Sequence, residues 1–135
     1  MSFDTSGTYN INIDFTISSW VRLDVLDSTN TILSKENALT TPNHLLVFSI
    51  TSSGNLQILI GNPDDLSQSE TVDSSGTIAA QDWKFVSVSV QLNTDAVTDK
   101  IVFNIDDSDE SPVNSASYHF RTDVTGNNMY LGAMR

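Results

Sequence analysis

The sequence predicts a single all-β domain, and three observations carry this prediction. Ser, Thr and Asn together make up 45 of the 135 residues, and these short polar side chains favour strands, turns and caps over helix interiors. Apolar and polar residues alternate in many short runs that are separated by turn residues. No stretch of eleven or more residues carries the apolar stripe of an amphipathic helix. This pattern is typical of a sandwich, a jelly roll or a barrel.

Alternation predicts the first strand over residues 15–23. Its odd-numbered positions are mostly apolar and share one face, while the even-numbered positions, Trp20 among them, share the other. Residues 27–30 form a predicted turn, and a short strand follows over residues 31–35. Residues 36–43 contain Thr-Thr-Pro and are expected to form a loop.

Two strongly apolar strands are predicted over residues 44–51 and 55–61, joined by a tight turn at Gly54. Glycine adopts positive φ without a Cβ clash, which such a turn requires. Both strands carry apolar residues on both faces, so we expect this hairpin inside a two-layer structure. Pro63 ends the second strand because it has no N–H group for a ladder.

The clearest strand of the second half covers residues 83–92, where Val86, Val88 and Val90 line one face. Residues 106–117 are expected to form a polar loop. The remaining predicted strands are residues 70–73, 77–80, 100–105, 117–121 and 128–132.

Length and charge limit the function classes. The 135 residues suit one domain, spanning residues 1–135, with one core. The net charge is −11 and the few cations do not cluster, which argues against binding to nucleic acid or to anionic lipid. No apolar run is long enough to span a membrane. The absence of cysteine excludes disulfides and zinc–thiolate sites.

Several short motifs occur in an order that is similar to one known superfamily. They are FTISSWVR at residues 15–22, TILSK at 31–35, SGNL at 53–56, DWKFVSVSV at 82–90, IVFNID at 101–106 and YLG at 130–132. In this series the chain resembles the laminin-G and concanavalin-A-like lectin superfamily, over nearly its whole length. The resemblance implies a two-sheet antiparallel β-sandwich, the concanavalin-A-like jelly roll.

The chain departs from that superfamily in two places. Asp107 stands where a glycine usually follows the aspartate of the turn, so we expect a different turn. The usual closing strand after the YLG motif is missing, so the jelly roll is expected to lack its last strand. An exposed sheet edge recruits further strands. We therefore expect either self-association through a sheet edge or coverage of the gap by residues 3–13.

Two acidic loops are the candidate ligand-binding sites. Carboxylates and amide oxygens at this density suit Ca²⁺, which takes six to eight oxygen ligands, although no EF-hand spacing is present. The alternative for each loop is a solvated turn. The candidate ligand-binding residues are Asn62, Asp64, Asp65, Asp106, Asp107 and Asp109, and the candidate Ca²⁺ ligands are Asp106, Asp107 and Asp109.

Other side chains are weaker candidates. Trp20 and Trp83 are suited to stacking on sugar rings, but both coincide with core landmarks of the superfamily, so we expect them to pack inside. His44 and His119 lie far apart in the sequence. No Glu-x-Asp-x-x-Glu strand motif and no G-x-S-x-G motif occurs, so no catalytic residues are assigned and the domain is not predicted to be an enzyme.

The leading hypothesis is a non-catalytic recognition module of a secreted or surface protein. It would bind a glycan or a protein ligand, with Ca²⁺ as a candidate cofactor. The predicted extracellular location rests on the resemblance alone. Residues 1–4 are polar and show no signal peptide. The alternative is a structural or assembly domain of a large adhesin or filament. The third hypothesis is a fragment of a glycoside hydrolase.

Overall fold

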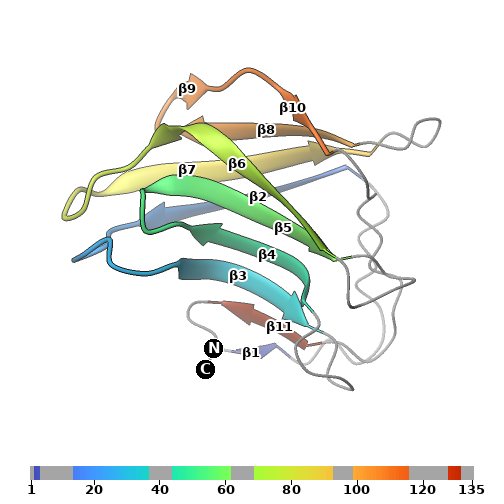
Figure 1. Ribbon diagram of the computed structural model, residues 1–135, viewed down its shortest axis with the longest axis horizontal. Coiled ribbons are helices and arrows are strands. Elements are labelled where there is room, and N and C mark those ends of the chain that lie inside the picture. Colours follow the sequence, from blue (N-terminus) through green and yellow to red (C-terminus); the bar gives the residue numbers. More distant parts are fainter. Residues whose placement is uncertain are drawn as a thin grey trace.

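The computed structural model describes residues 2–3, 14–36, 44–61, 69–92, 99–115 and 128–131. They form two antiparallel sheets that face each other (Figure 1). Sheet A has six strands in the order β1-β11-β3-β4-β5-β6. Sheet B has the order β10-β8-β7-β2, with β9 paired to β8. No helix in these residues is long and apolar enough to cross a membrane.

The strand bounds follow the alternation of the sequence closely. They are β1 Ser2–Phe3, β2 Phe15–Val21, β3 Asn30–Glu36, β4 His44–Ile50, β5 Asn55–Gly61, β6 Ser69–Thr77, β7 Lys84–Gln91, β8 Lys100–Ile105, β9 Ser108–Asp109, β10 Val113–Asn114 and β11 Asn128–Leu131.

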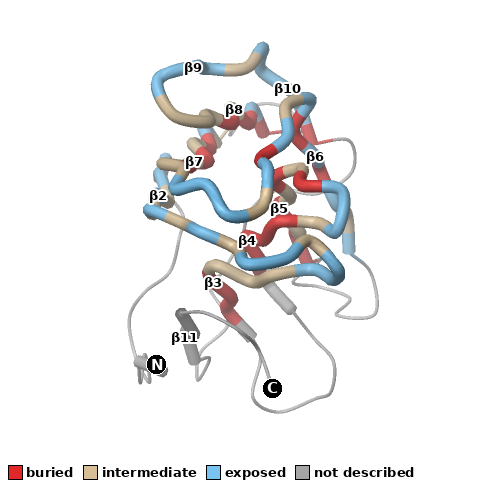
Figure 2. The backbone as a smooth tube through the Cα atoms, turned by 90° about the vertical axis from the view of Figure 1, so that its left-hand side faces the viewer, coloured by how far each residue is buried: buried red, intermediate tan, exposed pale blue. Residues whose placement is uncertain are grey.

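The core lies between the two sheets. Side chains of β4 and β5 meet those of β7 and β8, and the buried segments in Figure 2 lie on these strands. Phe48 and Phe103 are the largest side chains with no exposed surface. Burial of one such side chain contributes about 1.5–3 kcal/mol to the free energy of unfolding. The prediction of an all-β, two-sheet sandwich is confirmed.

The central strand β7 has the predicted faces. Val86, Val88 and Val90 are buried, and the intervening Ser87 and Ser89 are only half-buried on the opposite face. On β2, which pairs with β7 in antiparallel register, the odd-numbered residues are half-buried and the even-numbered residues are exposed. Sheet B therefore presents a polar outer face, as the alternation predicts.

The hairpin between β4 and β5 has the predicted turn at Gly54. Its φ is 86°, and its N–H donates to the carbonyl oxygen of Thr51 at 2.9 Å. The carbonyl oxygen of Gly54 accepts from the N–H of Ile78 at 2.9 Å. The turn thus also anchors the segment that follows β6.

Two predictions of local structure need correction. The two short strands at residues 70–73 and 77–80 are one strand, β6, which ends at Thr77. The join is possible because the buried Ser74 hydroxyl accepts from Leu56 N at 2.8 Å and donates to Gly76 O at 2.8 Å. The expected loop at residues 106–117 contains β9 and β10. The strand predicted at residues 117–121 and the segment 4–13 lie outside the described residues.

One carboxylate joins the two sheets where β6 passes β9 and β10. Glu110 accepts hydrogen bonds from the N–H groups of Ser75 and Gly76, at 2.8 Å and 2.7 Å, and from the Ser75 hydroxyl. The Glu110 N–H donates to Phe103 O in sheet B at 2.9 Å. On this side of the sandwich the Glu110 carboxylate therefore links sheet B to backbone N–H groups of sheet A.

Candidate ligand-binding groove

Two tryptophans lie on the surface, and the expectation that they pack in the core is wrong. Trp20 is 64% exposed and Trp83 is 65% exposed. Trp20 occupies an even-numbered position of β2, and these positions face away from the core. The inward positions are taken by Phe15, Ile17 and Val21, which pack against the core. The apolar area of both indoles is thus available to a ligand.

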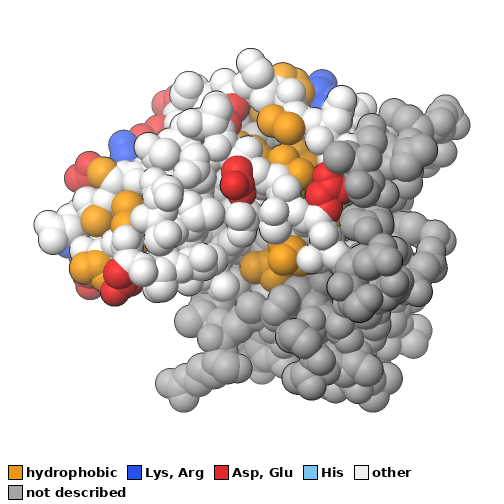
Figure 3. Space-filling view, viewed as in Figure 1, with side chains coloured by type: hydrophobic (Ala, Val, Ile, Leu, Met, Phe, Trp, Pro, Cys, Tyr) orange, Lys and Arg blue, Asp and Glu red, His pale blue; other side chains and the backbone are white. Residues whose placement is uncertain are grey.

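The two tryptophans lie at the same end of the sandwich, where β2 ends and β7 begins (Figure 1). Trp20 stands opposite Phe85 in the ladder. Their ring centroids are 5.5 Å apart and the ring planes are tilted by 58°, a favourable arrangement for aromatic pairs. Figure 3 shows hydrophobic side chains gathered at this left-hand end, with acidic ones beside them. The contact with Phe85 holds the Trp20 ring in place.

A groove with a volume of about 630 Å³ opens beside β2, between β2 and β3. We call it the β2 groove. Leu33 and Ile50 are buried and form its apolar floor, and the exposed Trp20 and Trp83 lie at its rim. Its described lining residues are residues 17–23, residues 30–33, Ile50 and Trp83. Aromatic rings at the rim of an apolar groove are what a sugar-binding or peptide-binding site requires.

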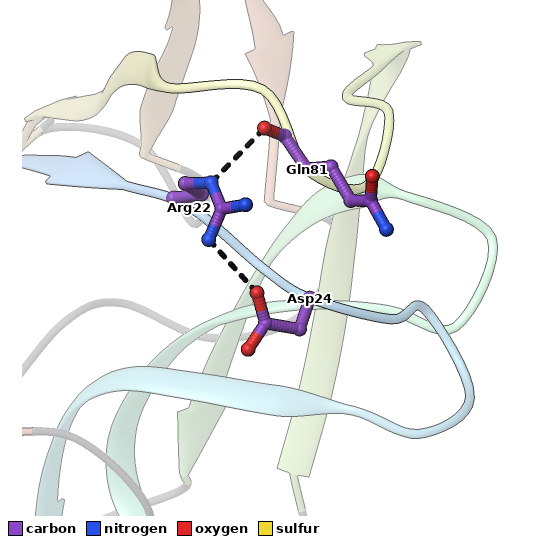
Figure 4. A network of polar contacts seen from close by, with 3 residues as sticks. All are labelled: Arg22, Asp24 and Gln81. Atoms are coloured by element: carbon purple, nitrogen blue, oxygen red, sulfur yellow. Dashed lines mark hydrogen bonds and ion pairs between the residues drawn. The ribbon is translucent and has the colours of Figure 1, made fainter.

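Arg22 braces the groove at its tryptophan end (Figure 4). Its Nε donates to the carbonyl oxygen of Gln81 at 3.1 Å, and its Nη1 lies 2.8 Å from Asp24 Oδ1. The Gln81 N–H donates to Leu23 O at 2.6 Å, and Gln81 has a φ of 71°. These bonds fix the segment before Trp83 against the end of β2. The backbone next to Trp83 is therefore held beside the end of the strand that carries Trp20.

A second, smaller hollow of about 360 Å³ is lined by the start of β2 together with parts of β7 and β8. Thr16 and Ser89 share a hydrogen bond of 2.9 Å at its base. Gln91 and Lys100 also line it, but no tryptophan does. It offers polar groups without a stacking surface, so the β2 groove is the stronger candidate.

The acidic turn after β8 has a structural role at its first residue. Asp106 Oδ2 lies 2.8 Å from Lys84 Nζ, and its Oδ1 accepts from the Phe85 N–H at 3.1 Å. The Asp106 N–H donates to Phe85 O at 2.7 Å, and its φ is 55°. Asp106 thereby fastens the β8–β9 turn to the start of β7. Asp106 itself takes the left-handed conformation in this turn.

These contacts shift two pKa values. The hydrogen bond from Lys84, followed by the one from the Phe85 backbone, lowers the pKa of Asp106. The hydrogen bond to Asp106, with its charge, raises the pKa of Lys84. Both shifts favour the charged pair. On β3, Lys35 is only 2% exposed, and this burial lowers the pKa of its ammonium group.

The other predicted site residues are not drawn together. Asp107 is exposed, and Asp109 Oδ1 accepts from Asn104 Nδ2 at 2.9 Å. Among the described residues no three His, Asp or Glu side chains form a group that could hold a metal ion. The carboxylates of Asp106 and Asp109 bond to separate partners, and Ca²⁺ binding at this turn stays a prediction. Asn62, Asp64 and Asp65 lie outside the described residues, as does His119.

Sequence reasoning undervalued the groove residues. Alternation had already placed Trp20 and Arg22 on the outer face of the first strand, and this signal was sufficient to predict exposure. Trp83 precedes its strand, so alternation alone did not fix its direction. No sequence signal identifies Gln81 as the partner of Arg22, because their bond joins residues 59 positions apart.

Comparison with known proteins identifies the fold. No family model and no curated protein matches the chain. Among solved structures, the mouse laminin α1 chain, domains LG4-5, superposes with a TM-score of 0.62 at 12% identity. The match covers 95% of this chain and 30% of the laminin chain. The chain thus spans less than a third of the laminin structure that it matches.

A second similar structure is the CBM40 module of a sialidase from Ruminococcus gnavus, bound to α2,3-sialyllactose. Its TM-score is 0.61 at 18% identity, and the match covers 95% of this chain and 71% of that one. The chain has the concanavalin-A-like jelly-roll fold. The resemblance drawn from the sequence motifs is confirmed at the level of the fold.

Proposed function

We propose that this jelly-roll domain is a non-catalytic recognition module that binds glycans in the β2 groove. The single observation that carries the proposal is the pair of exposed tryptophans at the rim of one apolar groove. Indole rings stack on the apolar faces of sugars, and such surfaces bury large area with little loss of side-chain freedom. The solved neighbours, a laminin G pair and a CBM40 module, support a binding role. They also support a place in a secreted or surface protein.

The hydrogen bonds of the described acids support a non-catalytic role. Glycoside hydrolysis uses a pair of carboxyl groups about 5–10 Å apart, one of them free to protonate the leaving group. Glu110 uses both oxygens on the backbone of β6, and Asp106 uses both on Lys84 and Phe85. These two acids hold strands together and are not presented to a substrate.

Substitution of the tryptophans tests the proposal. Trp20→Ala and Trp83→Ala should each weaken glycan binding by about five- to 150-fold, since stacking of a ring on an aromatic side chain is worth about 1–3 kcal/mol. Glycan arrays would find ligands, and calorimetry with and without Ca²⁺ would measure affinities. Val25→Ala is the matched control, because Val25 is 58% exposed but does not line the groove. Failure of the wild type to bind any glycan in either condition would count decisively against the proposal.

A second function, assembly with another chain, is favoured by the position of β2. It pairs with β7 on one side, and no other described strand pairs with it on the other. Its apolar side chains border the β2 groove. A structural or assembly domain of an adhesin or filament would use this edge to add a strand from a partner.

A further inference from the structure

We infer that the β2 groove takes an uncharged oligosaccharide that lies along β2, and not an acidic or sulfated glycan. The inference rests on the proposed function and narrows its ligand class. It also separates this domain from its structural neighbour, the CBM40 module whose bound ligand is sialyllactose. Charge, hydrogen-bonding groups and groove length each support it.

The charges around the groove disfavour an anionic ligand. Among the described lining residues, Arg22 is the only ionisable side chain. Its guanidinium bonds to Asp24, 2.8 Å away, and to the Gln81 carbonyl oxygen. The Asp24 carboxylate offsets the charge of Arg22 and would repel a ligand carboxylate or sulfate that approached its remaining N–H groups. Lys84, another cation of this end, is paired with Asp106. The chain as a whole carries a net charge of −11, which repels anions during approach.

The polar groups of the lining match neutral hydroxyls. Ser18 and Thr31 carry hydroxyls for which the described part of the chain offers no partner, and Asn30 keeps its side-chain oxygen for a further bond. Each hydroxyl both donates and accepts, as sugar hydroxyls do. Short side chains of this kind complete the hydrogen bonds of a neutral sugar without a charge to compensate. Trp20 and Trp83 supply the stacking surface beside them.

The length of the groove indicates more than one sugar ring. The lining follows β2 and its continuation over residues 17–23, which extend over roughly 20 Å at about 3.3 Å per residue. The groove lies along a strand over the whole of this stretch. Such a shape accepts an inner stretch of a chain of sugars. We therefore expect affinity to rise from disaccharide to hexasaccharide.

Matched neutral and charged probes test the inference. Calorimetry of the wild-type chain would compare lactose with sialyllactose, and cello-, xylo- and mannohexaose with a hexagalacturonate and a heparin hexasaccharide. We expect binding by at least one neutral hexasaccharide, with an affinity that hardly changes between low and high salt. Salt screens charge–charge attraction and leaves stacking intact. Tighter binding of any acidic probe than of every neutral one, weakened by salt, would overturn the inference while leaving glycan binding in place.

A charge variant gives an independent measurement. Asp24→Asn releases Arg22 and should strengthen binding of sialyllactose by on the order of two- to fivefold, the range expected for an exposed ion pair. Asp27→Asn removes the same charge from the same loop but is no partner of Arg22, so it should produce no such gain. Equal changes in sialyllactose affinity in the two variants would show that the bond to Asp24 does not limit how Arg22 binds an acidic ligand. Absence of binding to every neutral and acidic probe would instead refute the proposed function itself.

Discussion

Asp106 shows how one residue closes a turn. Its backbone has a φ of 55° and its N–H bonds to Phe85 O, while its carboxylate binds both the Phe85 N–H and the Lys84 ammonium. Asp and Asn adopt the left-handed conformation more readily than other side chains. A carboxylate is the only side chain of that size that also pairs with a lysine. The turn alone therefore accounts for an aspartate at this position.

The pH dependence of stability should reveal this contact. Because the folded pKa of Asp106 is lowered, its contribution is present above the unfolded pKa and is lost as pH falls through the folded one. Lys84 has a raised pKa, so its contribution holds below its unfolded value and is lost as pH rises through the folded one. We expect Asp106→Asn to be less stable than wild type near neutral pH, with the difference shrinking towards acid.

Urea unfolding over a pH series measures that difference. Asp107→Asn is the matched control, because the Asp107 carboxylate is next to Asp106 in the sequence and is exposed. It should follow the wild-type curve throughout. An Asp106→Asn curve parallel to wild type down to the most acidic pH would show that the ion pair adds nothing to folding.

At the scale of elements, the hairpin of β4 and β5 depends on Gly54. A Cβ at this position would lie 2.4 Å from the Ile78 carbonyl oxygen, and the φ of 86° is unfavourable for other residues. We expect Gly54→Ala to lower the free energy of unfolding by about 1–3 kcal/mol, measured by urea titration. Ser53→Ala, in the same exposed turn, should change it by less than about 0.5 kcal/mol. Similar losses in both variants would place the strain elsewhere in the hairpin.

Strands were the elements most accessible to prediction. The period of two in residues 84–91 defines which valines are buried, because successive side chains point to opposite faces. The joining of two predicted strands into β6 was not accessible, since it depends on hydrogen bonds of Ser74 with Leu56 in another strand. Local sequence therefore yields faces and periods, whereas strand length depends on partners distant in the chain.

The candidate site was much less predictable than the fold. Four acids in five residues suggested a metal site, but the structure gives Asp106 and Asp109 different partners in different strands. The superfamily motif wrongly placed Trp20 in the core, although alternation had put it on the outer face of sheet B. The face on which a residue lies was thus a better indicator of exposure than its place in a motif.

At the scale of the whole molecule, association becomes a measurable property because no described strand pairs with one side of β2. Adding a strand satisfies a row of backbone groups, but two copies with a net charge of −11 each repel one another. Salt screens that repulsion. We expect sedimentation at increasing salt to show a dimer that tightens, whereas a monomer at every salt concentration and at high protein concentration would exclude the edge as a contact.

Glu110 has a consequence for how far such growth can proceed. Its carboxylate occupies the N–H groups of Ser75 and Gly76 on β6, the outermost long strand of sheet A. β1 and β10, which form the opposite edges of sheets A and B, are only two residues long. They therefore offer few backbone groups to an added strand. The Ser75 and Gly76 donors at the end of the β6 edge are thus closed to an incoming strand. Glu110→Ala would free them and extend the length of β6 on which a fibre-like stack of copies could grow.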